Sequence, residues 1–271
     1  MEPTVPSTKQ WTESKAVRKA RKALLKQQAG EKLQPNTPGD KHIVCLKWGH
    51  KYSADYVNKL YNMTMRHSEM DYHFHCFTEN PVGIDSHINT HKLPKINKLQ
   101  GWWYKPWFFS NDLPIRGTLL FLDLDIVVCN NIDRFFNYKP EKDFVIIRDF
   151  NRTIRPNWDR VNSSVFRLQI GSRAYQWDNF LKQKDDTVRR MPGDQDWMYR
   201  AAKPYDYWPD DWVRSYKWEM RDRRDLELRQ GVRVFKNIGY PQVHKDQSIA
   251  VFHGRPNPED CKDPWVIENW Q

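Results

Sequence analysis

Short apolar runs that alternate with helical stretches are the feature that most constrains this fold. From residue 42 onward, runs rich in Val, Ile, Leu and Phe recur along the chain. Near-continuous apolar strands of this kind predict a sheet that is covered on both faces. The strands expected on this basis are 42–48, 72–78, 118–128, 143–149, 163–170, 232–238 and 249–254.

Helical stretches fall between these runs, at 53–68, 102–112, 173–184 and 195–202. Strands that alternate with helices indicate an α/β fold with a mainly parallel sheet. A chain of 271 residues can bury one substantial core. We therefore expect a single α/β domain over residues 42–271.

Residues 1–41 differ in composition from the rest of the chain. They hold nine Lys or Arg residues against four Asp or Glu residues, and few large apolar side chains. Such a segment buries too little apolar surface to offset the entropy of ordering. We predict a flexible basic tail, with weak peripheral contact with an anionic membrane or a partner as the alternative. The formal charge of +10 also favours an anionic partner, such as a nucleotide, a nucleic acid or a phosphorylated glycan.

The cysteine pattern points to a reducing compartment. The four cysteines lie far apart and form no CxxC pair, so we expect free thiols, not a zinc site or a disulfide framework. No apolar stretch reaches the roughly 18–20 residues that cross a bilayer. A soluble, cytoplasmic protein is expected.

The segment FLDLDIVV, residues 121–128, places two aspartates inside an apolar run. On a strand, side chains two residues apart point the same way, so Asp123 and Asp125 should project together near the carboxyl end of a central strand. Ligands of open α/β sheets gather at those ends. A hard divalent ion, Mg²⁺ or Mn²⁺, bridging to a diphosphate would relieve the repulsion between the carboxylates. The alternative is a strand-end pair that reaches solvent or caps the next turn.

Further polar residues end or begin the other apolar runs. His253 ends the run IAVFHG, where its imidazole is either a third metal ligand or an ordinary core histidine. Asp194, Gln195 and Asp196 lie in the turn PGDQDWM, before an aromatic helix, where an Asp is also a common N-cap.

Short polar side chains precede one more apolar run. The segment VNSSVFR places Asn162, Ser163 and Ser164 ahead of a strand. Amide and hydroxyl groups of this kind suit sugar hydroxyls, and they are equally ordinary in a turn.

Taken together, these motifs resemble the nucleotide-sugar glycosyltransferases of the GT-A fold, in particular glycosyltransferase family eight and its bacterial and viral relatives. The DxD segment FLDLDIVV follows WGHKY (48–52), CFTEN (76–80) and GWWYKPWFF (101–109), and it precedes NSSV, DQD, VFHGRPNP and PWV (264–266). The resemblance extends over residues 42–266. It implies a Rossmann-like, mixed and mainly parallel sheet flanked by helices in one domain.

The same resemblance implies roles for individual residues. Asp123, Asp125 and His253 would bind Mn²⁺ or Mg²⁺, and Asp194 and Gln195 would lie at the reacting face. Contacts with the nucleotide, the diphosphate or the donor sugar would come from the other matching positions, which are Cys45, Lys47, Trp48, Gly49, Tyr52, Lys105, Asp123, Asn162 and Ser163.

The family's lysine after the His-Gly pair, which binds the diphosphate, has no counterpart here. Asn257 stands where it is expected, and Arg255 is the nearest cation. A guanidinium can hold a phosphate through two parallel hydrogen bonds, so Arg255 is the expected replacement.

The implied activity is metal-dependent transfer of a sugar from a nucleotide-sugar, a UDP-sugar by analogy, to a glycan, lipid or protein acceptor. Retention of anomeric configuration is expected because the DQD segment matches. Inversion would instead need a carboxylate base, for which Asp194, Asp196 and Asp211 are candidates.

The segment WPDDWVRSYKWEMRDRRD, residues 208–225, alternates aromatic and charged residues. We expect it to lie outside the core, where indole rings would stack on acceptor sugars. Asp211, Trp212 and Lys217 are candidate contacts, and an aromatic surface loop or partner interface is the alternative.

Two other functions share some of these features. The letters DLDIV also fit phosphatases of the haloacid dehalogenase type, with Asp123 as nucleophile, although a long sheet-forming stretch precedes them here. A basic nucleic-acid-binding protein without catalysis is the other candidate. It is less favoured, because much of the excess charge lies in residues 1–41 and no helix-turn-helix, RRM or zinc pattern follows.

Overall fold

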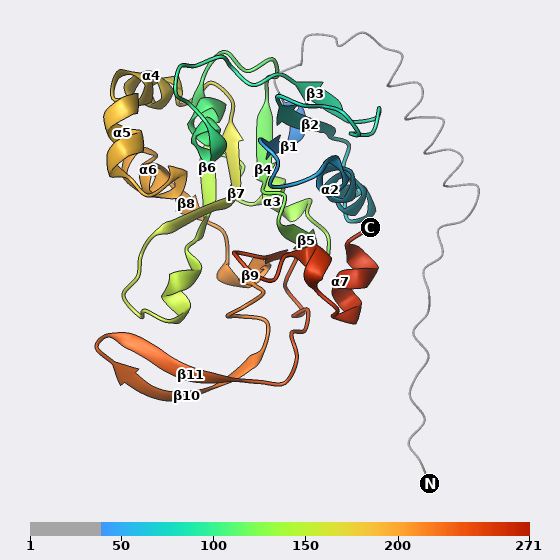
Figure 1. Cartoon of the computed structure of the whole chain (residues 1–271), viewed down its shortest axis with the longest axis vertical. Helices are drawn as coiled ribbons and strands as arrows, with labels where there is room; N and C mark the ends of the chain where they lie inside the picture. The colour runs from blue at the N-terminus through green and yellow to red at the C-terminus, as the bar shows by residue number, and fades with distance from the viewer. Residues whose placement is uncertain (1–38) are drawn as a thin grey trace, which may run out of the picture. The chain divides into compact units, whose positions relative to one another are not determined.

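The computed structural model describes residues 39–271 (Figure 1). The predicted basic tail, except its last three residues, lies outside the described part. Seven strands form the central sheet in the order β3-β2-β1-β4-β7-β6-β8. Their bounds are β1 Lys41–Lys47, β2 His73–Thr78, β3 Asn89–His91, β4 Thr118–Leu122, β6 Phe144–Arg148, β7 Val161–Gln169 and β8 Asp206–Tyr207.

The central sheet is mixed and mainly parallel, as predicted. Every neighbouring pair is parallel except the two pairs that β7 makes, with β4 and with β6. Strand β7 therefore runs against the others. Its first residues lie at the edge where the other strands end.

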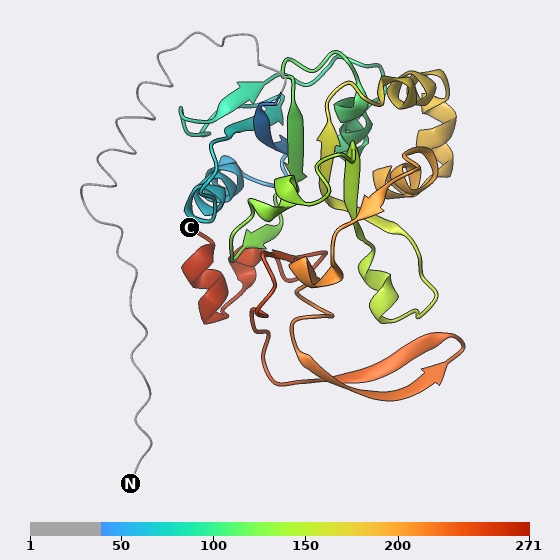
Figure 2. The same ribbon diagram turned by 180° about the vertical axis from the view of Figure 1, so that it is seen from behind.

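Helices cover both faces of this sheet (Figures 1 and 2). Helix α2 (Ala54–Arg66) presents Tyr56, Val57 and Leu60 to one face, where they join Ile43 of β1 in one core cluster. The opposite face carries η1, α4 and α6, with bounds Gly101–Phe109, Ala174–Lys182 and Asp194–Ala201. Burial on both faces is the physical reason that the strands are apolar at almost every position.

The second, three-stranded sheet has the order β5-β12-β9, and it also contributes to the core. Its strands are β5 Ile126–Val128, β9 Val213–Ser215 and β12 Ile249–Val251. The predicted run 249–254 therefore pairs with β5 and not with the central sheet. The remaining helical segments are α3 Arg134–Asn137, η2 Phe150–Thr153, α5 Lys184–Arg190, η3 Asp210–Trp212, η4 Pro258–Asp260 and α7 Pro264–Asn269.

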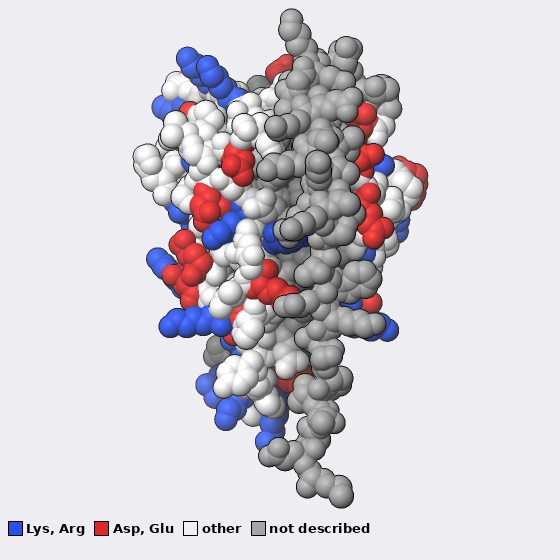
Figure 3. Space-filling view, turned by 90° about the vertical axis from the view of Figure 1, so that its right-hand side faces the viewer, with Lys and Arg blue, Asp and Glu red and all other residues white. Residues whose placement is uncertain are grey.

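A separate hairpin of β10 (Asp222–Arg229) and β11 (Val232–Ile238) lies apart from both sheets. The predicted strand 232–238 exists, but it forms half of this hairpin and not a strand of the central sheet. All of β10 is exposed. On the face shown in Figure 3 both signs of charge are interspersed, and Lys and Arg gather toward the lower end, at the height of the hairpin in Figure 1.

The described residues bear on two predictions from the sequence, one about the cysteines and one about membrane-spanning segments. All four cysteines are buried and unpaired in disulfides, as expected for free thiols. Within residues 39–271, no helix is both long enough and apolar enough to cross a bilayer.

Candidate active site

Polar residues converge at the edge where the parallel strands of the central sheet end. Asp123 follows β4 and Asp149 follows β6, while Ser163 lies near the start of the antiparallel β7. Helix α6 begins at this edge with Asp194. Sequence-distant residues therefore meet here because of strand direction, as in other open α/β sheets.

The predicted single strand 118–128 is wrong, because the strand is interrupted at residues 123–125, which include both aspartates. Strand β4 ends at Leu122, and β5 begins at Ile126 in the other sheet. The amide of Asp123 donates to the Ser164 carbonyl at 2.9 Å, whereas the Asp125 carbonyl accepts from the Phe252 amide at 2.9 Å. The two aspartates thus join different sheets. Strand alternation does not set the directions of their side chains.

Lys105 is the charged centre of the site. Its Nζ lies 2.9 Å from Oδ1 and 3.0 Å from Oδ2 of Asp123, and 3.5 Å from Oδ2 of Asp194. It also donates to the carbonyl and the hydroxyl of Ser163, at 3.2 and 3.3 Å. The sequence predicted a helix over 102–112, and the structure has the tighter η1 segment there. A lysine inside this aromatic segment is buried because the carboxylates surround it.

The local backbone explains how Ser163 reaches Lys105. The ladder between β6 and β7 shifts register after the Ile146–Phe166 pair, and it resumes at Ile147–Asn162. The residues between these pairs on β7 form a bulge, which re-aims side chains at the end of a sheet. Asn162 itself turns inward, because its Oδ1 accepts from the Ser164 amide at 2.9 Å.

Asp125 is held separately from Asp123. The hydroxyl of Tyr52 donates to Asp125 Oδ2 at 2.8 Å. Burial, followed by the charge of Asp125, raises the pKa of Tyr52, so the phenol remains a donor. Tyr52 was predicted as a nucleotide contact, and the structure places it against the second aspartate.

Burial and mutual charge shape the titration of these groups. Burial raises the pKa of Asp123 to about 6, Lys105 opposes this change, and Asp125 adds to it. Burial also raises the pKa of Asp125, although the Tyr52 hydrogen bond opposes the change. Burial alone would lower the pKa of Lys105, but Asp123 and Asp194 outweigh it and raise that pKa. Both aspartates therefore favour a further cation.

Asp149 is a site residue that the sequence analysis missed. It is buried, and its Oδ2 accepts a hydrogen bond from Gln195 Nε2. Its Oδ1 accepts from the backbone amide and the side-chain amide of Asn151, at 2.7 and 2.8 Å. The available signal was an aspartate directly after the apolar strand 143–149, the same pattern that singled out Asp123.

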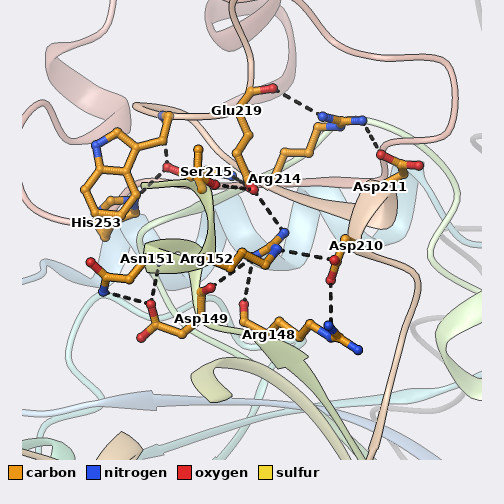
Figure 4. A network of polar contacts seen from close by, with 12 residues as sticks. Arg148, Asp149, Asn151, Arg152, Asp210, Asp211, Arg214, Ser215, Glu219 and His253 are labelled. Carbon is orange, nitrogen blue, oxygen red and sulfur yellow. Dashed lines mark hydrogen bonds and ion pairs between the residues drawn. The ribbon is translucent and has the colours of Figure 1, made fainter. Parts of the chain in front are cut away.

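His253 belongs to a polar network that runs through Ser215, Glu219 and Arg152 to Asp149 (Figure 4). Its Nε2 lies 2.6 Å from Ser215 Oγ, and its ring stacks on Phe150. Burial, followed by the charge of Lys217, lowers the pKa of His253 to about 4, whereas Asp149 opposes the change. The imidazole is therefore neutral at pH 7. Its Nδ1 makes no hydrogen bond within the described part of the chain.

Glu219 anchors the rest of this network. Its carboxylate accepts from Thr153 Oγ1 at 2.8 Å and from the Ser215 amide at 2.9 Å, and it pairs with Arg152 at 3.0 Å (Figure 4). These contacts tie η2, which follows β6, to β9. They fix Ser215, the hydrogen-bond partner of His253.

The proposed metal ligands are not gathered into one cluster. Within residues 39–271, no group of three or more His, Cys, Asp and Glu side chains could hold a metal ion as it stands. Asp123 is engaged by Lys105, Asp125 by Tyr52 and His253 by Ser215. Mg²⁺ and similar ions often take only one or two carboxylates and complete their shell with water and substrate phosphates. Asp123 and Asp125, with their raised pKa values, fit that mode of binding.

The residues predicted to hold the nucleotide lie at the end of β1. Lys47 is buried, yet it forms no ion pair within the described residues. Trp48 meets Trp102 edge-on, with ring centroids 6.0 Å apart. Gly49 has a φ of +57°, a left-handed conformation that a glycine adopts without strain. Cys45 has no exposed surface, so it supports this segment from the core and offers no contact to a ligand.

The predicted phosphate clamp after His253 is engaged elsewhere. Arg255 pairs with Asp260 at 3.0 Å, and its side chain is 82 % exposed. Asn257 and Asp260 form a reciprocal capping box at the start of η4. Asn257 therefore has a structural role as a helix cap.

Residues 208–225 are more buried than predicted. Trp208, Val213, Tyr216 and Met220 all belong to a core cluster, so the segment is not an exterior strip of aromatic rings. The prediction that this segment lies outside the core was wrong. Charged residues of the segment point outward, but they alternate with positions that are buried.

The other candidates in this region and in α6 have partners of their own. Asp211 forms an ion pair with Arg214, and Asp196 pairs with Arg160 at 3.1 Å. Trp212 is partly buried against Tyr138, with ring centroids 5.3 Å apart. Neither carboxylate joins the Lys105 cluster.

The architecture is that of the GT-A glycosyltransferases, as solved structures show. Superposition on an active-site mutant of LgtC gives a TM-score of 0.55 at 11 % identity and covers 84 % of this chain and 93 % of that one. A galactosyltransferase LgtC complex with donor and acceptor sugar analogs gives a TM-score of 0.50, also at 11 % identity, over 80 % of this chain and 88 % of that one. At this identity the likeness shows a shared fold, which confirms the predicted fold class.

Comparison of the sequence with protein-family models gave no match, and comparison with curated proteins gave none either. The structural likeness therefore rests on the arrangement of strands and helices.

Proposed function

We propose that this chain is a glycosyltransferase that moves a sugar from a nucleotide-sugar donor to a saccharide-bearing acceptor. The observation that carries the proposal is the Lys105–Asp123–Asp194 cluster, which lies at the carboxyl edge of a GT-A sheet. LgtC, which shares this fold, has been solved with donor and acceptor sugar analogs. A phosphatase with Asp123 as nucleophile is less compatible, because Lys105 contacts both oxygens of that carboxylate.

The donor would lie along the ends of β1 and β4. Lys47, a cation without an ion pair, would face the diphosphate, and Trp48 would contact the base. Asp123 and Asp125 would hold Mn²⁺ or Mg²⁺, which when bound stabilises the negative charge that develops on the leaving diphosphate. A UDP-sugar is proposed as donor by analogy with the family that the sequence resembles.

Asp194 and Gln195 would face the reacting carbon. Gln195 donates through its Nε2 to Asp149, and Gln195 Oε1 has no hydrogen bond within residues 39–271. That amide oxygen can stabilise the positive charge that develops on the sugar ring.

In the proposed retaining reaction, the bond from the anomeric carbon to the diphosphate breaks and a bond to the acceptor oxygen forms on the same face. The acceptor proton passes to the departing phosphate oxygen.

Thermal shift measurements with a panel of sugar nucleotides, with and without Mn²⁺, test this proposal. A ligand that binds only the folded state raises the melting temperature. We expect one UDP-sugar to do so in a Mn²⁺-dependent way, and the Asp125→Asn variant to lose that shift. The control is Asp55→Asn, which alters a largely exposed carboxylate on α2. If no sugar nucleotide raises the melting temperature of the wild-type chain, the proposal is wrong.

A further inference from the structure

Residues of α4, α5 and α6 and of the segments that join them line a cavity of about 300 Å³. These helices lie on the flank of the sheet opposite α2 (Figure 1). The cavity is separate from the Lys105 cluster, and nothing in the proposed reaction uses it. Its volume is at the lower end of the range for small-molecule sites. The residues that matter here are Gln176, Asn179, Phe180, Gln183, Trp197 and Arg200.

Gln176 supplies a buried acceptor without a partner. Its side chain is 3 % exposed, and its Oε1 makes no hydrogen bond. Its Nε2 donates to the Tyr175 hydroxyl at 3.2 Å. Gln176 lines the cavity, and a buried acceptor left unpaired is costly, so this residue favours a ligand that donates a hydrogen bond to its amide.

The other groups match the surface of a sugar ring. Gln176 and Asn179 are three residues apart on one face of α4, and Gln183 follows the end of that helix, so three amides line the cavity. Amides both donate and accept, as sugar hydroxyls do. Phe180 and Trp197 add aromatic rings to the wall, with centroids 5.4 Å apart. Aromatic surface beside amides accommodates a ring that has apolar C–H faces and polar edges.

Arg200 determines the charge of the ligand. It is the only charged side chain among the residues that line the cavity, and it forms no ion pair or hydrogen bond within residues 39–271. A guanidinium pairs with a carboxylate through two parallel hydrogen bonds. We infer that this cavity binds a pyranose unit that carries a carboxylate, a uronic acid.

The cavity is connected to the candidate active site by α6. That helix starts with Asp194 and Gln195 at the site, and Trp197 and Arg200, three and six residues after Asp194, line the cavity. Eight residues of helix rise about 12 Å, so both places lie within the span of a short oligosaccharide. A uronic acid in the cavity would thus be a unit of the acceptor glycan. That last link rests on the proposed function, whereas binding to the cavity does not.

The test is equilibrium binding of two methyl glycosides to the full chain, without nucleotide or metal. Methyl β-D-glucuronide and methyl β-D-glucoside differ only at C6, which is a carboxylate in the first and a hydroxymethyl group in the second. We expect the glucuronide to bind about fivefold tighter, as one solvent-accessible ion pair would provide. Arg200→Gln should remove this preference while weak binding of both glycosides remains. The double variant Asn179→Ala/Gln183→Ala should lose both.

Asp178→Asn is the matched control, because Asp178 lies on α4 but does not line the cavity. It should bind as the wild type does. The inference is overturned if neither glycoside binds the wild-type chain, if both bind equally, or if Arg200→Gln keeps the preference. Because donor and metal are left out, a failure of sugar transfer would not change these results.

Discussion

The ammonium of Lys105 contacts both carboxylate oxygens of Asp123, at 2.9 and 3.0 Å, although the Lys105 side chain is only 6 % exposed. Removal of the cation leaves a largely buried carboxylate without its partner. We expect Lys105→Met to lower the free energy of unfolding by about 2–4 kcal/mol at pH 7. Urea denaturation measures this loss.

A double-mutant cycle separates this pair from a simple packing effect. Lys105→Met combined with Asp123→Asn should be more stable than the sum of the single losses predicts, because no unpaired charge remains. Lys142→Met is the control, since its pair with Asp206 is partly exposed and should contribute less than about 1 kcal/mol. Equal losses for the two lysine variants would contradict the buried-pair explanation.

Gln195 donates to the buried Asp149, so Gln195→Glu places two carboxyl groups against each other. We expect this variant to lose about 1–2 kcal/mol at pH 7, because like charges at contact repel. Part of that loss should return toward pH 5, since one carboxyl of the pair then takes up a proton. Melting temperatures at both pH values provide the measurement.

The matched control for this substitution is Gln242→Glu. Gln242 is exposed and forms only a backbone hydrogen bond, so its variant should show no such pH dependence. Should Gln195→Glu behave like this control, the contact with Asp149 contributes nothing to stability. In a transfer assay, Gln195→Glu should also reduce turnover.

Three histidines form a hydrogen-bonded chain across β1, β2 and β3, away from the candidate site. His42 Nδ1 lies 3.0 Å from His75 Nε2, and His75 Nδ1 lies 2.9 Å from His91 Nε2. His42 Nε2 is 2.6 Å from the Arg116 carbonyl, which can only accept. Burial lowers the pKa values of all three rings and so favours their neutral forms, and in these forms every ring donates through Nε2.

Acid should destabilise the protein through these three histidines. Burial lowers the pKa of His42 to about 4, with smaller opposing effects from the Arg116 carbonyl and Asp40, and His73 and His91 lower it further. Burial likewise lowers the pKa values of His75 and His91. The unfolded chain binds these protons first, so stability is complete above pH 6.5 and falls as the pH drops toward 4.

The expected loss for His42 alone is about 2 kcal/mol between pH 7.5 and pH 5. His42→Gln should show a smaller difference in unfolding free energy between these pH values, even if it is less stable at both. The exposed His50, changed to Gln, is the control and should leave the difference as in the wild type. If the His42→Gln variant keeps the full pH dependence of the unfolding free energy, the three histidines are not the source of that dependence.

The β10–β11 hairpin should be the first part of residues 39–271 that trypsin cleaves. Its strands pair with neither sheet, Leu226 and Leu228 are mostly exposed, and a two-stranded hairpin by itself is marginally stable. Mass spectrometry should place the first cut within this range between Arg221 and Lys236. A first cut in one of the central elements, such as α4, would contradict the expectation.

Much of the fold follows from local pattern. Most predicted strands and helices match observed elements to within a few residues, because the repeat of buried positions is encoded by neighbours in the sequence. The resemblance to glycosyltransferases also predicted that one site contains Asp123, Lys105, Ser163 and Asp194. The structure places these four residues together.

Other features required the folded chain. Arg167 interrupts an apolar run, yet it is fully buried because its guanidinium donates to backbone carbonyls of residues 135–142. Nothing near it in the sequence indicates those partners. The break after Leu122 was likewise invisible, since apolar residues continue on both sides of it.

The sequence by itself determined which segments become strands and helices, and that acidic residues follow the strands. Only the tertiary structure decided which of these residues meet: Lys105 with Asp123, Tyr52 with Asp125, and Gln195 with Asp149. The physical reason is that periodicity records whether a side chain is buried, whereas its partner depends on strand order, direction and register, which are set by packing between distant parts of the chain.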